Sequence, residues 1–336
     1  MKLLVLGGTR FLSRRVAAEA MAAGHDVTCA ARGEHGSPPD GTAFVRWDRA
    51  DPVPAALAEA RPDAVVDVTS TPAQAARAVA AWPDAHWVYV STLNVYADET
   101  RRGASVADSD LVAPRETGDL RADPEAYGAM KVACENHVRA GAATALVLRP
   151  GLIVGPGDPS GRFAYWPSHA AQAGEDGGGL LVPGTPDDPV QLIDVGDLAG
   201  WIVRALERGT TGTFDAICPP LTRAEFVAGL QQGVGETVEP VYVPSAWLAD
   251  QGVAEWSGPD SIPLWVADPQ AAGFMTRDVS ASLAAGLAIR PLADTVRATA
   301  AWLAATPDAV VTGLTRAEEC DLLAAARTAR PGATSG

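Results

Sequence analysis

The chain has 336 residues, of which 47% are hydrophobic, and it carries 26 Lys and Arg against 41 Asp and Glu, a net charge of −15. Because no basic cluster stands out, nucleic acid and anionic membranes are not expected as partners. No apolar run approaches the roughly 18–20 residues of a membrane span, and the four cysteines and five histidines show no metal-ligand spacing. We therefore expect a cytoplasmic protein with reduced thiols, no metal and a small-molecule substrate.

The first half of the chain alternates short apolar runs with Ala-rich stretches of helical pattern. Met1–Leu6 runs directly into a glycine turn, so it is typical of a first strand and not of a signal peptide. The predicted strands are Leu3–Leu6, Val27–Ala30, Ala43–Val45, Ala64–Val68, Trp87–Val90 and Ala145–Leu148, and the predicted helices are Arg14–Ala23, Pro54–Ala60, Ala73–Trp82 and Glu125–Ala140. This alternation predicts an α/β fold with a Rossmann-type doubly wound parallel sheet. The ligand of such a sheet is expected at the carboxyl ends of its strands.

The pattern changes after about residue 150, where the chain becomes rich in Gly, Pro and Asp. A later apolar run, Thr213–Ile217, is a candidate for a strand that returns to the sheet, and helices are predicted near Arg223–Gln232, Leu292–Ala304 and Arg316–Arg327. We predict a dinucleotide-binding domain over residues 1–150, with a returning strand near 190–218. Residues 151–189 and 219–330 would form a smaller C-terminal substrate-binding domain, and residues 331–336 a flexible tail.

A glycine turn lies between the first predicted strand and the first predicted helix, and its sequence is Gly7-Gly8-Thr9-Arg10-Phe11-Leu12-Ser13. At this place the helix N-terminus offers free N–H groups to a pyrophosphate. A Gly-x-x-Gly-x-x-Gly spacing would require glycine at 7, 10 and 13, but the chain has Gly7, Arg10 and Ser13. The motif is degenerate, and an ordinary strand-to-helix turn is the alternative. The cofactor contacts expected from it are Gly7, Thr9, Arg10, Phe11 and Leu12.

Arginine near the end of the second strand bears on the choice of cofactor. That strand ends in Ala30-Ala31-Arg32-Gly33, where NAD sites usually carry Asp or Glu and an Arg accommodates the 2′-phosphate of NADP. Arg10 and Arg32 together favour NADP, with NAD as the alternative, although either could be a solvated surface charge. Asp48, just after the third strand, is a candidate for the adenine amino group and equally for a loop-capping residue.

Tyr127 and Lys131 are four positions apart in a predicted helix and so share one of its faces. Lys131 and Lys2 are the only lysines of the chain, against 24 arginines. An ammonium beside a phenol favours the phenolate and lowers the pKa of the tyrosine from its usual value near 10. Tyr127 is therefore a candidate proton donor or acceptor near neutral pH. An ordinary surface Tyr–Lys pair is the alternative.

Taken together, these segments resemble the extended short-chain dehydrogenase/reductase superfamily, the NAD-dependent epimerase/dehydratase group. The resemblance covers most of the first 200 residues, and its anchors are the glycine turn at Gly7, Tyr89–Tyr96, Tyr127–Lys131, Leu148–Pro156 and Gln191–Ala199. The start Gly7–Phe11 looks like an atypical branch, some of whose members have lost catalysis and act as sensors or RNA-associated proteins. Many relatives dimerise through a four-helix interface, so a monomer or a homodimer is expected.

The resemblance implies a role for each residue of a catalytic set. Thr92 would hydrogen-bond the substrate oxygen, with Ser91 the weaker candidate, and Tyr127 would transfer the proton. Lys131 would bind the nicotinamide ribose and depress the pKa of Tyr127. The further cofactor contacts that the resemblance implies are Thr69 and Ser70, which would lie along the cofactor, and Pro150 and Ile153, near the nicotinamide.

The segments around this set bear on the reaction. Nucleotide-sugar dehydratases usually follow the catalytic Thr with Asp-Glu, but here Leu93-Asn94 follows, so dehydration is not expected. Many nucleotide-sugar epimerases carry an Asn where this chain has Arg149–Ile153, which is closer to reductase-like members. The expected substrate contacts are Asn94, Arg162, Tyr165 and Trp166. An aromatic lid suits a carbonyl compound with an apolar body, although Tyr165 and Trp166 could instead pack the small domain.

The leading hypothesis from sequence is an NADPH-dependent carbonyl reductase or alcohol dehydrogenase that uses Thr92, Tyr127 and Lys131. The first alternative is an epimerase with tightly held NAD(P), which passes through a transient ketone. The second is a non-catalytic nucleotide-sensing protein, supported by the degenerate glycine motif.

Overall fold

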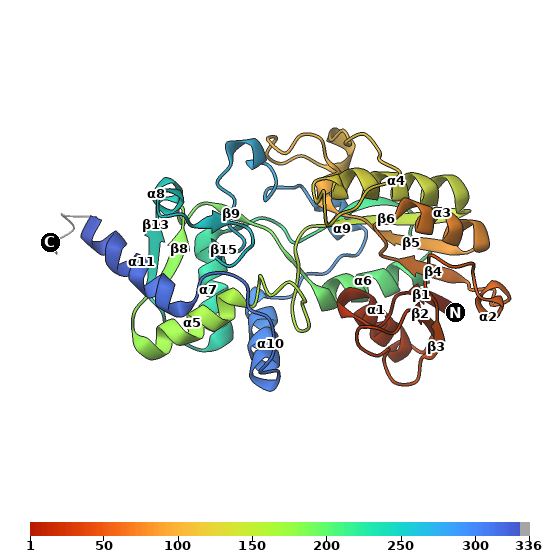
Figure 1. Ribbon diagram of the computed structural model, residues 1–336, viewed down its shortest axis with the longest axis horizontal. Coiled ribbons are helices and arrows are strands. Elements are labelled where there is room, and N and C mark those ends of the chain that lie inside the picture. The colour runs from red at the N-terminus through yellow and green to blue at the C-terminus, as the bar shows by residue number, and fades with distance from the viewer. Residues whose placement is uncertain (330–336) are drawn as a thin grey trace. The chain divides into compact units, whose positions relative to one another are not determined.

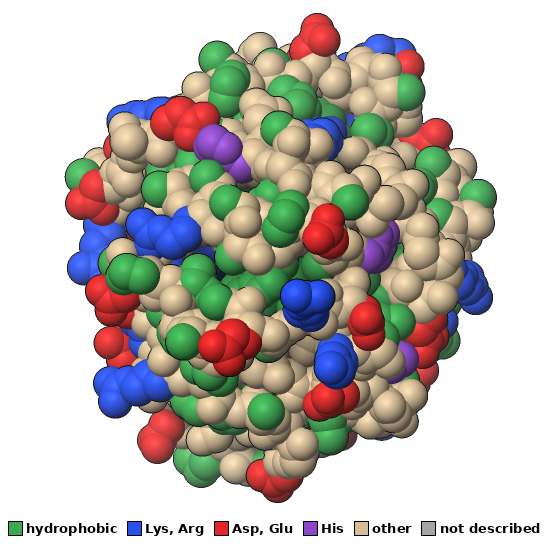
Figure 2. Space-filling model, turned by 90° about the vertical axis from the view of Figure 1, so that its right-hand side faces the viewer, with side chains coloured by type: hydrophobic (Ala, Val, Ile, Leu, Met, Phe, Trp, Pro, Cys, Tyr) green, Lys and Arg blue, Asp and Glu red, His purple; other side chains and the backbone are tan. Residues whose placement is uncertain are grey.

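The computed structural model describes residues 1–329, and its internal contacts divide the chain into two units (Figure 1). The first unit consists of Met1–Ile153, Leu192–Pro219 and Arg277–Ile289, and the second of Val154–Gln191, Pro220–Thr276 and the residues from Arg290 onward. The tail predicted at 331–336 lies outside the described residues. Within residues 1–329, every helix is too short or too polar to cross a membrane. Acidic and basic side chains are interspersed on the face seen in Figure 2.

A parallel sheet of seven strands forms the centre of the first unit, in the order β11-β6-β5-β4-β1-β2-β3. Its strands are β1 Lys2–Leu6, β2 Asp26–Ala31, β3 Ala43–Arg46, β4 Ala64–Asp67, β5 His86–Val90, β6 Thr144–Pro150 and β11 Gly212–Ala216. In the register, Leu3 of β1 lies beside Val27 of β2 and Ala64 of β4. The predicted doubly wound, Rossmann-type sheet is confirmed, and the predicted returning strand is found as β11.

Helices cover both faces of this sheet, which explains why its central strands are apolar at every position. Helices α1 and α6 lie on one side of the sheet, and α3 and α4 on the other (Figure 1). Leu3 and Val5 of β1 belong to a core shared with α1 and α6, whereas Leu4 and Leu6 belong to a core shared with α2, α3 and α4. Successive side chains of a strand point to opposite faces, so a strand between two helical layers has to be apolar throughout. The helices of this unit are α1 Phe11–Ala22, α2 Ala55–Ala58, α3 Pro72–Ala81, α4 Ala126–Gly141, α6 Val195–Glu207 and α9 Ser280–Ala284, with 3-10 turns η1 Leu93–Val95 and η2 Val106–Asp108.

Helix α6 is an element that the sequence reasoning missed, although its start carries a readable signal. The side chain of Asp194 accepts hydrogen bonds from the backbone N–H groups of Gly196 and Asp197, as an N-cap residue does. Leu198 and Trp201 then follow at helical spacing and are buried in the core against α1. An Asp before an apolar residue pattern of this kind marks a helix start.

Residues 277–289 belong to the first unit and not, as the sequence suggests, to the substrate-binding region. Arg277 is 4% exposed and donates through Nε to Asp215 Oδ2 of β11 at 2.8 Å and through Nη1 to Ser109 Oγ at 3.0 Å. Its guanidinium carbon lies 3.8 Å from the ring centre of Tyr96, and Ser282 donates to the Asp215 carbonyl at 2.6 Å. A buried carboxylate requires a cation and hydrogen bonds, so Asp215 holds this late segment in the first unit.

The second unit is built mainly of helices. Helix α7 (Arg223–Val234) packs against α10 (Leu292–Ala305) and α5 (Tyr165–Asp176), and β8 (Leu180–Pro183) pairs in parallel with β13 (Pro240–Val243). The helices predicted near 223–232, 292–304 and 316–327 are found as α7, α10 and α11 (Arg316–Ala329). The remaining short elements of the chain are β7 Ile153–Val154, β9 Pro189–Val190, β10 Ile193–Asp194, β12 Leu221–Thr222, α8 Ser245–Asp250, β14 Ala254–Glu255, β15 Ser261–Ile262 and η3 Pro269–Ala271.

Helix α4 approaches the turn η1 closely because position 128 has no side chain. A Cβ built on Gly128 would lie 2.0 Å from the carbonyl oxygen of Asn94 and 2.8 Å from its carbonyl carbon. Both atoms are backbone, so the turn cannot move aside by a change of rotamer. The glycine therefore sets the distance between the first turn of α4, which contains Tyr127, and the segment after β5.

We expect Gly128→Ala to destabilise the protein, although alanine is favoured over glycine inside a helix by about 0.5–1 kcal/mol. The overpacking cost should exceed this gain, since extra methyl groups in tight cores typically cost about 1–3 kcal/mol. Gly200→Ala in α6 is the matched control. A Cβ on Gly200 would lie 3.0 Å from Arg204 Nη1, which is the end of a flexible side chain and can move aside. Denaturant unfolding should show Gly200→Ala as neutral or stabilising, and equal stability of the two variants would contradict this account of Gly128.

Candidate active site

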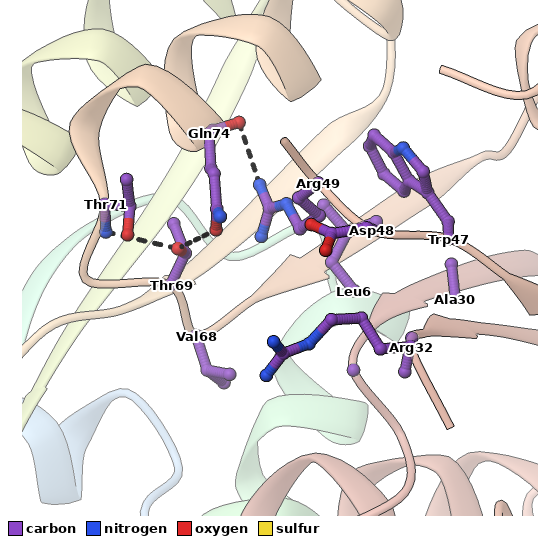
Figure 3. Close-up of a pocket in the computed structure, with 12 residues that line it drawn as sticks. Leu6, Ala30, Arg32, Trp47, Asp48, Arg49, Val68, Thr69, Thr71 and Gln74 are labelled. Atoms are coloured by element: carbon purple, nitrogen blue, oxygen red, sulfur yellow. Dashed lines mark hydrogen bonds between the residues drawn. The ribbon is translucent and has the colours of Figure 1, made fainter. Parts of the chain in front are cut away.

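A cavity of about 450 Å³ lies at the carboxyl ends of β1 to β4 in the first unit (Figure 3). Each of the four strands contributes to its wall, through Gly7 after β1, Arg32 after β2, Asp48 after β3 and Thr69 after β4, and Gln74 joins them from α3. Strand β1 lies between β2 and β4, so the strand order reverses here. Doubly wound sheets bind their ligands at this reversal.

The glycine turn forms despite its degenerate sequence. Gly7 and Gly8 have φ values of 126° and 87°, and a Cβ on Gly8 would lie 2.4 Å from Cys29 Sγ in β2. The hydroxyl of Ser13 accepts the Gly8 N–H at 3.0 Å and donates to the Arg10 carbonyl at 3.0 Å. Ser13, which stands where the motif has its third glycine, therefore holds the turn together from inside.

The start of α1 fits the pyrophosphate of a dinucleotide. Arg10 occupies the N-cap position, and its side chain makes no capping hydrogen bond. The first N–H groups of a helix have no partner within the helix and favour an anion. Gly7, at the start of the turn, lines the cavity, so the turn and the cavity meet at this residue.

Only one of the two arginines expected to select the cofactor lies at the cavity. Arg32 is in its wall and extends toward its middle in Figure 3, with half of its side chain exposed and Glu34 at 3.2 Å. Arg10 is exposed at the start of α1 and lies outside the cavity wall. Asp48 also lines the cavity, while its Oδ1 accepts the Ala50 N–H at 2.9 Å, so it caps its own loop.

Lys131 lies behind the cavity wall, buried to 2% exposure. Its Nζ donates to the carbonyl oxygens of Val68, Thr69 and Val90 at 3.1, 2.9 and 2.7 Å, and it lies 5.9 Å from the ring centre of Tyr127. Burial lowers the pKa of Lys131 to about 8. Because an ammonium has three donors, a bond to a ribose hydroxyl would require one of these carbonyls to be replaced.

Thr92 lies directly after β5, two residues beyond the Val90 carbonyl that binds Lys131. Its Oγ1 donates to Asn94 Oδ1 at 2.8 Å and accepts the Asn94 N–H at 3.3 Å. The close contact at Gly128 places the first turn of α4 against this segment, and Tyr127 is half-buried there. The structure thus brings Thr92, Tyr127 and Lys131 to the carboxyl ends of β4 and β5.

A buried polar network supports α4 from beneath. Arg149 of β6 donates to Glu135 Oε1 and Oε2 at 3.0 and 2.7 Å and to Tyr96 Oη at 3.1 Å, and Tyr96 donates to Asp215 at 2.5 Å. Burial opposes the ionisation of Glu135, but the bonds from Arg149 lower its pKa below the usual value. Sequence reasoning assigned no role to this network, although Tyr96 and Arg149 both lie in the quoted family segments.

The other predicted cofactor residues divide between the cavity and the core. Thr69 lines the cavity and Ser70 is half-buried in the same turn. The side chain of Leu12 is 6% exposed and packs in the sheet core, so a cofactor contact of this residue would be made by its backbone N–H. Thr9 is half-buried, and Pro150 is the buried end of β6. Phe11 and Ile153 are partly buried and pack against the sheet core.

The aromatic substrate contacts expected in the second unit are core residues. Tyr165 and Trp166 are both 0% exposed. The Tyr165 ring stacks on His169 at 3.8 Å between ring centres, and Trp166 Nε1 donates to the Pro263 carbonyl at 3.0 Å. The expectation of an aromatic lid is therefore corrected, because enclosed rings cannot contact a substrate. Arg162 is half-buried, with its guanidinium carbon 5.0 Å from the Trp256 ring centre.

Among residues 1–329, no three His, Cys, Asp or Glu side chains are grouped so as to hold a metal ion.

We expect Gly8→Ala to lower stability much more than Gly24→Ala. Both glycines have a positive φ, 87° and 82°, which costs an alanine roughly 1–2 kcal/mol. Only Gly8 faces a rigid neighbour, since its Cβ would also lie 2.7 Å from Cys29 Cβ, whereas nothing lies within 4 Å of a Cβ on Gly24. Thermal unfolding of both variants measures the difference, and equal losses would mean that the close packing of the turn on β2 does not matter.

Comparison with known proteins agrees with this geometry. Residues 3–216 match the model of the NAD dependent epimerase/dehydratase family. No curated protein sequence matches the chain.

Solved structures share the fold. The Bordetella bronchiseptica enzyme WbmH in complex with NAD+ has 19% identity and a TM-score of 0.60, over 90% of this chain and 98% of its own. The Thermus thermophilus UDP-glucose 4-epimerase complex with NAD has 20% identity and a TM-score of 0.59, over 92% and 100%. The Bacillus cereus UDP-N-acetylglucosamine 4-epimerase has 18% identity and a TM-score of 0.61, over 90% and 96%.

The matched segment of 214 residues, from 3 to 216, is more than half of the 336-residue chain, and it contains the glycine turn and the Thr92, Tyr127 and Lys131 set. The chain therefore belongs to the NAD dependent epimerase/dehydratase family.

Proposed function

We propose that the chain is a nicotinamide-dependent epimerase that acts on a nucleotide sugar or a related hydroxyl compound. One observation carries the proposal: Thr92, Tyr127 and Lys131 meet at the same edge of the sheet as the dinucleotide cavity. Lys131 donates to the carbonyls of Val68 and Thr69, and both residues line that cavity. The turn of Val68 and Thr69 thus connects the candidate proton-transfer residues to the cavity proposed for the cofactor.

Two findings favour epimerisation over the carbonyl reductase hypothesis. The reductase hypothesis drew part of its support from an aromatic lid for an apolar substrate, but Tyr165 and Trp166 are enclosed in a core. The structural neighbours named above include epimerases of UDP-sugars, which supports the epimerase alternative. The retained Thr92, Tyr127 and Lys131 set weighs against a non-catalytic sensor.

The side chains of the site suit proton transfer to and from a substrate hydroxyl group. A bound nicotinamide dinucleotide would supply hydride acceptance and return. Tyr127 Oη would take the proton of the substrate hydroxyl and give it back, and the ammonium of Lys131 favours the phenolate that this requires. The Thr92 hydroxyl, which now donates to Asn94 Oδ1, would turn to hold the substrate oxygen.

We expect Tyr127→Phe to lower the rate of epimerisation by roughly 10²–10⁴-fold, the usual contribution of one acid–base group. The assay follows interconversion of UDP-sugar epimers, with the affinity for NAD(P) measured by calorimetry as the control for an intact site. Near-normal turnover by Tyr127→Phe would exclude the mechanism.

The same assay separates the two reactions. An epimerase returns its hydride, so wild-type protein should convert substrate without net consumption of added NADPH or NADH. Stoichiometric consumption with a carbonyl substrate would reinstate the reductase hypothesis.

We further propose that Arg32 gives the cavity a preference for NADP. NAD is the alternative, since two of the three neighbours named above are complexes with NAD. Arg32→Ala should then weaken NADPH binding by roughly tenfold or more and leave NADH binding nearly unchanged, because a guanidinium–phosphate contact is a charge-assisted one. Arg61→Ala is the matched control, since Arg61 is exposed and lies outside the cavity wall. Equal affinities for NADPH and NADH in the wild type would rule out this role.

A further inference from the structure

A buried carboxylate lies directly before the turn that holds Lys131. Asp67, the last residue of β4, is 0% exposed. Arg49 donates to its two oxygens through Nη1 and Nη2 at 2.6 and 2.8 Å. Arg49 Nη2 also donates to the Gln74 carbonyl at 2.9 Å, a bond drawn in Figure 3. Buried ion pairs are weak as general stabilisers compared with apolar packing. A pair in this position therefore calls for a more specific role.

The carboxylate is connected to Lys131 through the backbone of one residue. Asp67 Oδ1 accepts the Thr69 N–H at 2.9 Å. The Thr69 carbonyl accepts both Tyr89 Oη at 2.7 Å and Lys131 Nζ at 2.9 Å, and Thr69 Oγ1 donates to Gln74 Oε1 at 2.8 Å. The carbonyl that binds the ammonium cannot turn without breaking these contacts.

We propose that Asp67 is a positioning residue for Lys131: together with Arg49 it fixes the Val68 and Thr69 carbonyls that bind the ammonium, and its negative charge attracts that ammonium. The importance of Lys131 for catalysis rests on the proposed function, whereas the link from Asp67 to Lys131 does not depend on it.

The charges around Lys131 determine the direction in which its pKa should change when one of them is removed. The titratable and charged groups that face it come from α4, β4, β5 and the loop after β3, and they are Tyr127, Cys134, Glu135, Asp67, Tyr89 and Arg49. Burial lowers the pKa of Lys131 to about 8, Asp67 raises it and Arg49 lowers it. Removal of the Asp67 charge leaves the Arg49 charge unbalanced, so the pKa of Lys131 should fall. Removal of the Arg49 charge should make it rise.

Because the chain has only two lysines, the pKa of Lys131 can be measured in the protein without cofactor or substrate. Lysine labelled with ¹³C at Cε gives signals from Lys2 and Lys131 alone, and the Lys131→Arg variant identifies which is which. In a pH titration followed by NMR, Asp67→Asn should move the Lys131 midpoint down and Arg49→Met should move it up, each on the order of one pH unit. Shifts of the midpoint in the same direction, or no shift, would overturn the proposal, because loss of the ion pair alone would not move the Lys131 midpoint in opposite directions in the two variants.

Two further variants keep the test decisive. Glu319→Gln breaks another buried acid–arginine pair, with Arg316 in the second unit, and should leave the Lys131 midpoint unmoved; an equal shift there would count against a specific link. If either single variant fails to fold, the double variant Arg49→Met/Asp67→Asn leaves no unpaired buried charge. It should still lower the Lys131 midpoint, since Asp67 accepts the N–H of Thr69, whose carbonyl binds Lys131, and an unmoved midpoint would overturn the proposal.

The outcomes also separate this proposal from the proposed function. Opposite midpoint shifts in a protein without epimerase activity would support the positioning role and reject the reaction. In an active enzyme, the alkaline limb of the kcat profile should follow the Lys131 midpoint, downward in Asp67→Asn and upward in Arg49→Met. If the enzyme is active but neither substitution moves the Lys131 midpoint, the positioning role is wrong and the proposed reaction stands.

Discussion

The burial of one ammonium group among three backbone carbonyls is the constraint on which the site depends. A charge removed from water is costly unless its hydrogen bonds are replaced. Lys131 meets this demand because β4 and β5 end side by side, and it donates to the carbonyls of Val68 and Thr69 after β4 and of Val90 at the end of β5. The same requirement accounts for the bonds that fix Thr69 and for the close approach of α4, which carries the lysine.

The fold could be read from the sequence because its physical signal is local. A strand covered on both faces is an unbroken apolar run, as in Ala64–Asp67 up to its final residue, and such runs stand out. Lys131 stood out for another reason, since a chain that otherwise uses arginine has placed a lysine four residues after a tyrosine. Helix α6 was missed because its N-cap, Asp194, was taken only as part of a motif.

The parts of the site that could not be predicted depend on tertiary contacts. Tyr165 and Trp166 would have the same sequence in a lid or in a core, and only their enclosure by neighbours such as His169 and Pro263 decides between the two. Ser13 departs from the glycine pattern, yet its hydroxyl closes the turn by two hydrogen bonds. The pairing of Arg49 with Asp67 joins residues 18 positions apart, and no sequence spacing predicts such a contact.

The segment that supplies Arg277 has a consequence for how the protein is made. The first unit receives this cation for Asp215 only after the intervening residues of the second unit have been synthesised. A nascent chain that has emerged only to Pro219 contains every strand of the large sheet but leaves the Tyr96–Asp215 end of the network without its counter-charge. The first unit is therefore completed only late in translation, and a fragment that ends with the matched family segment lacks Arg277.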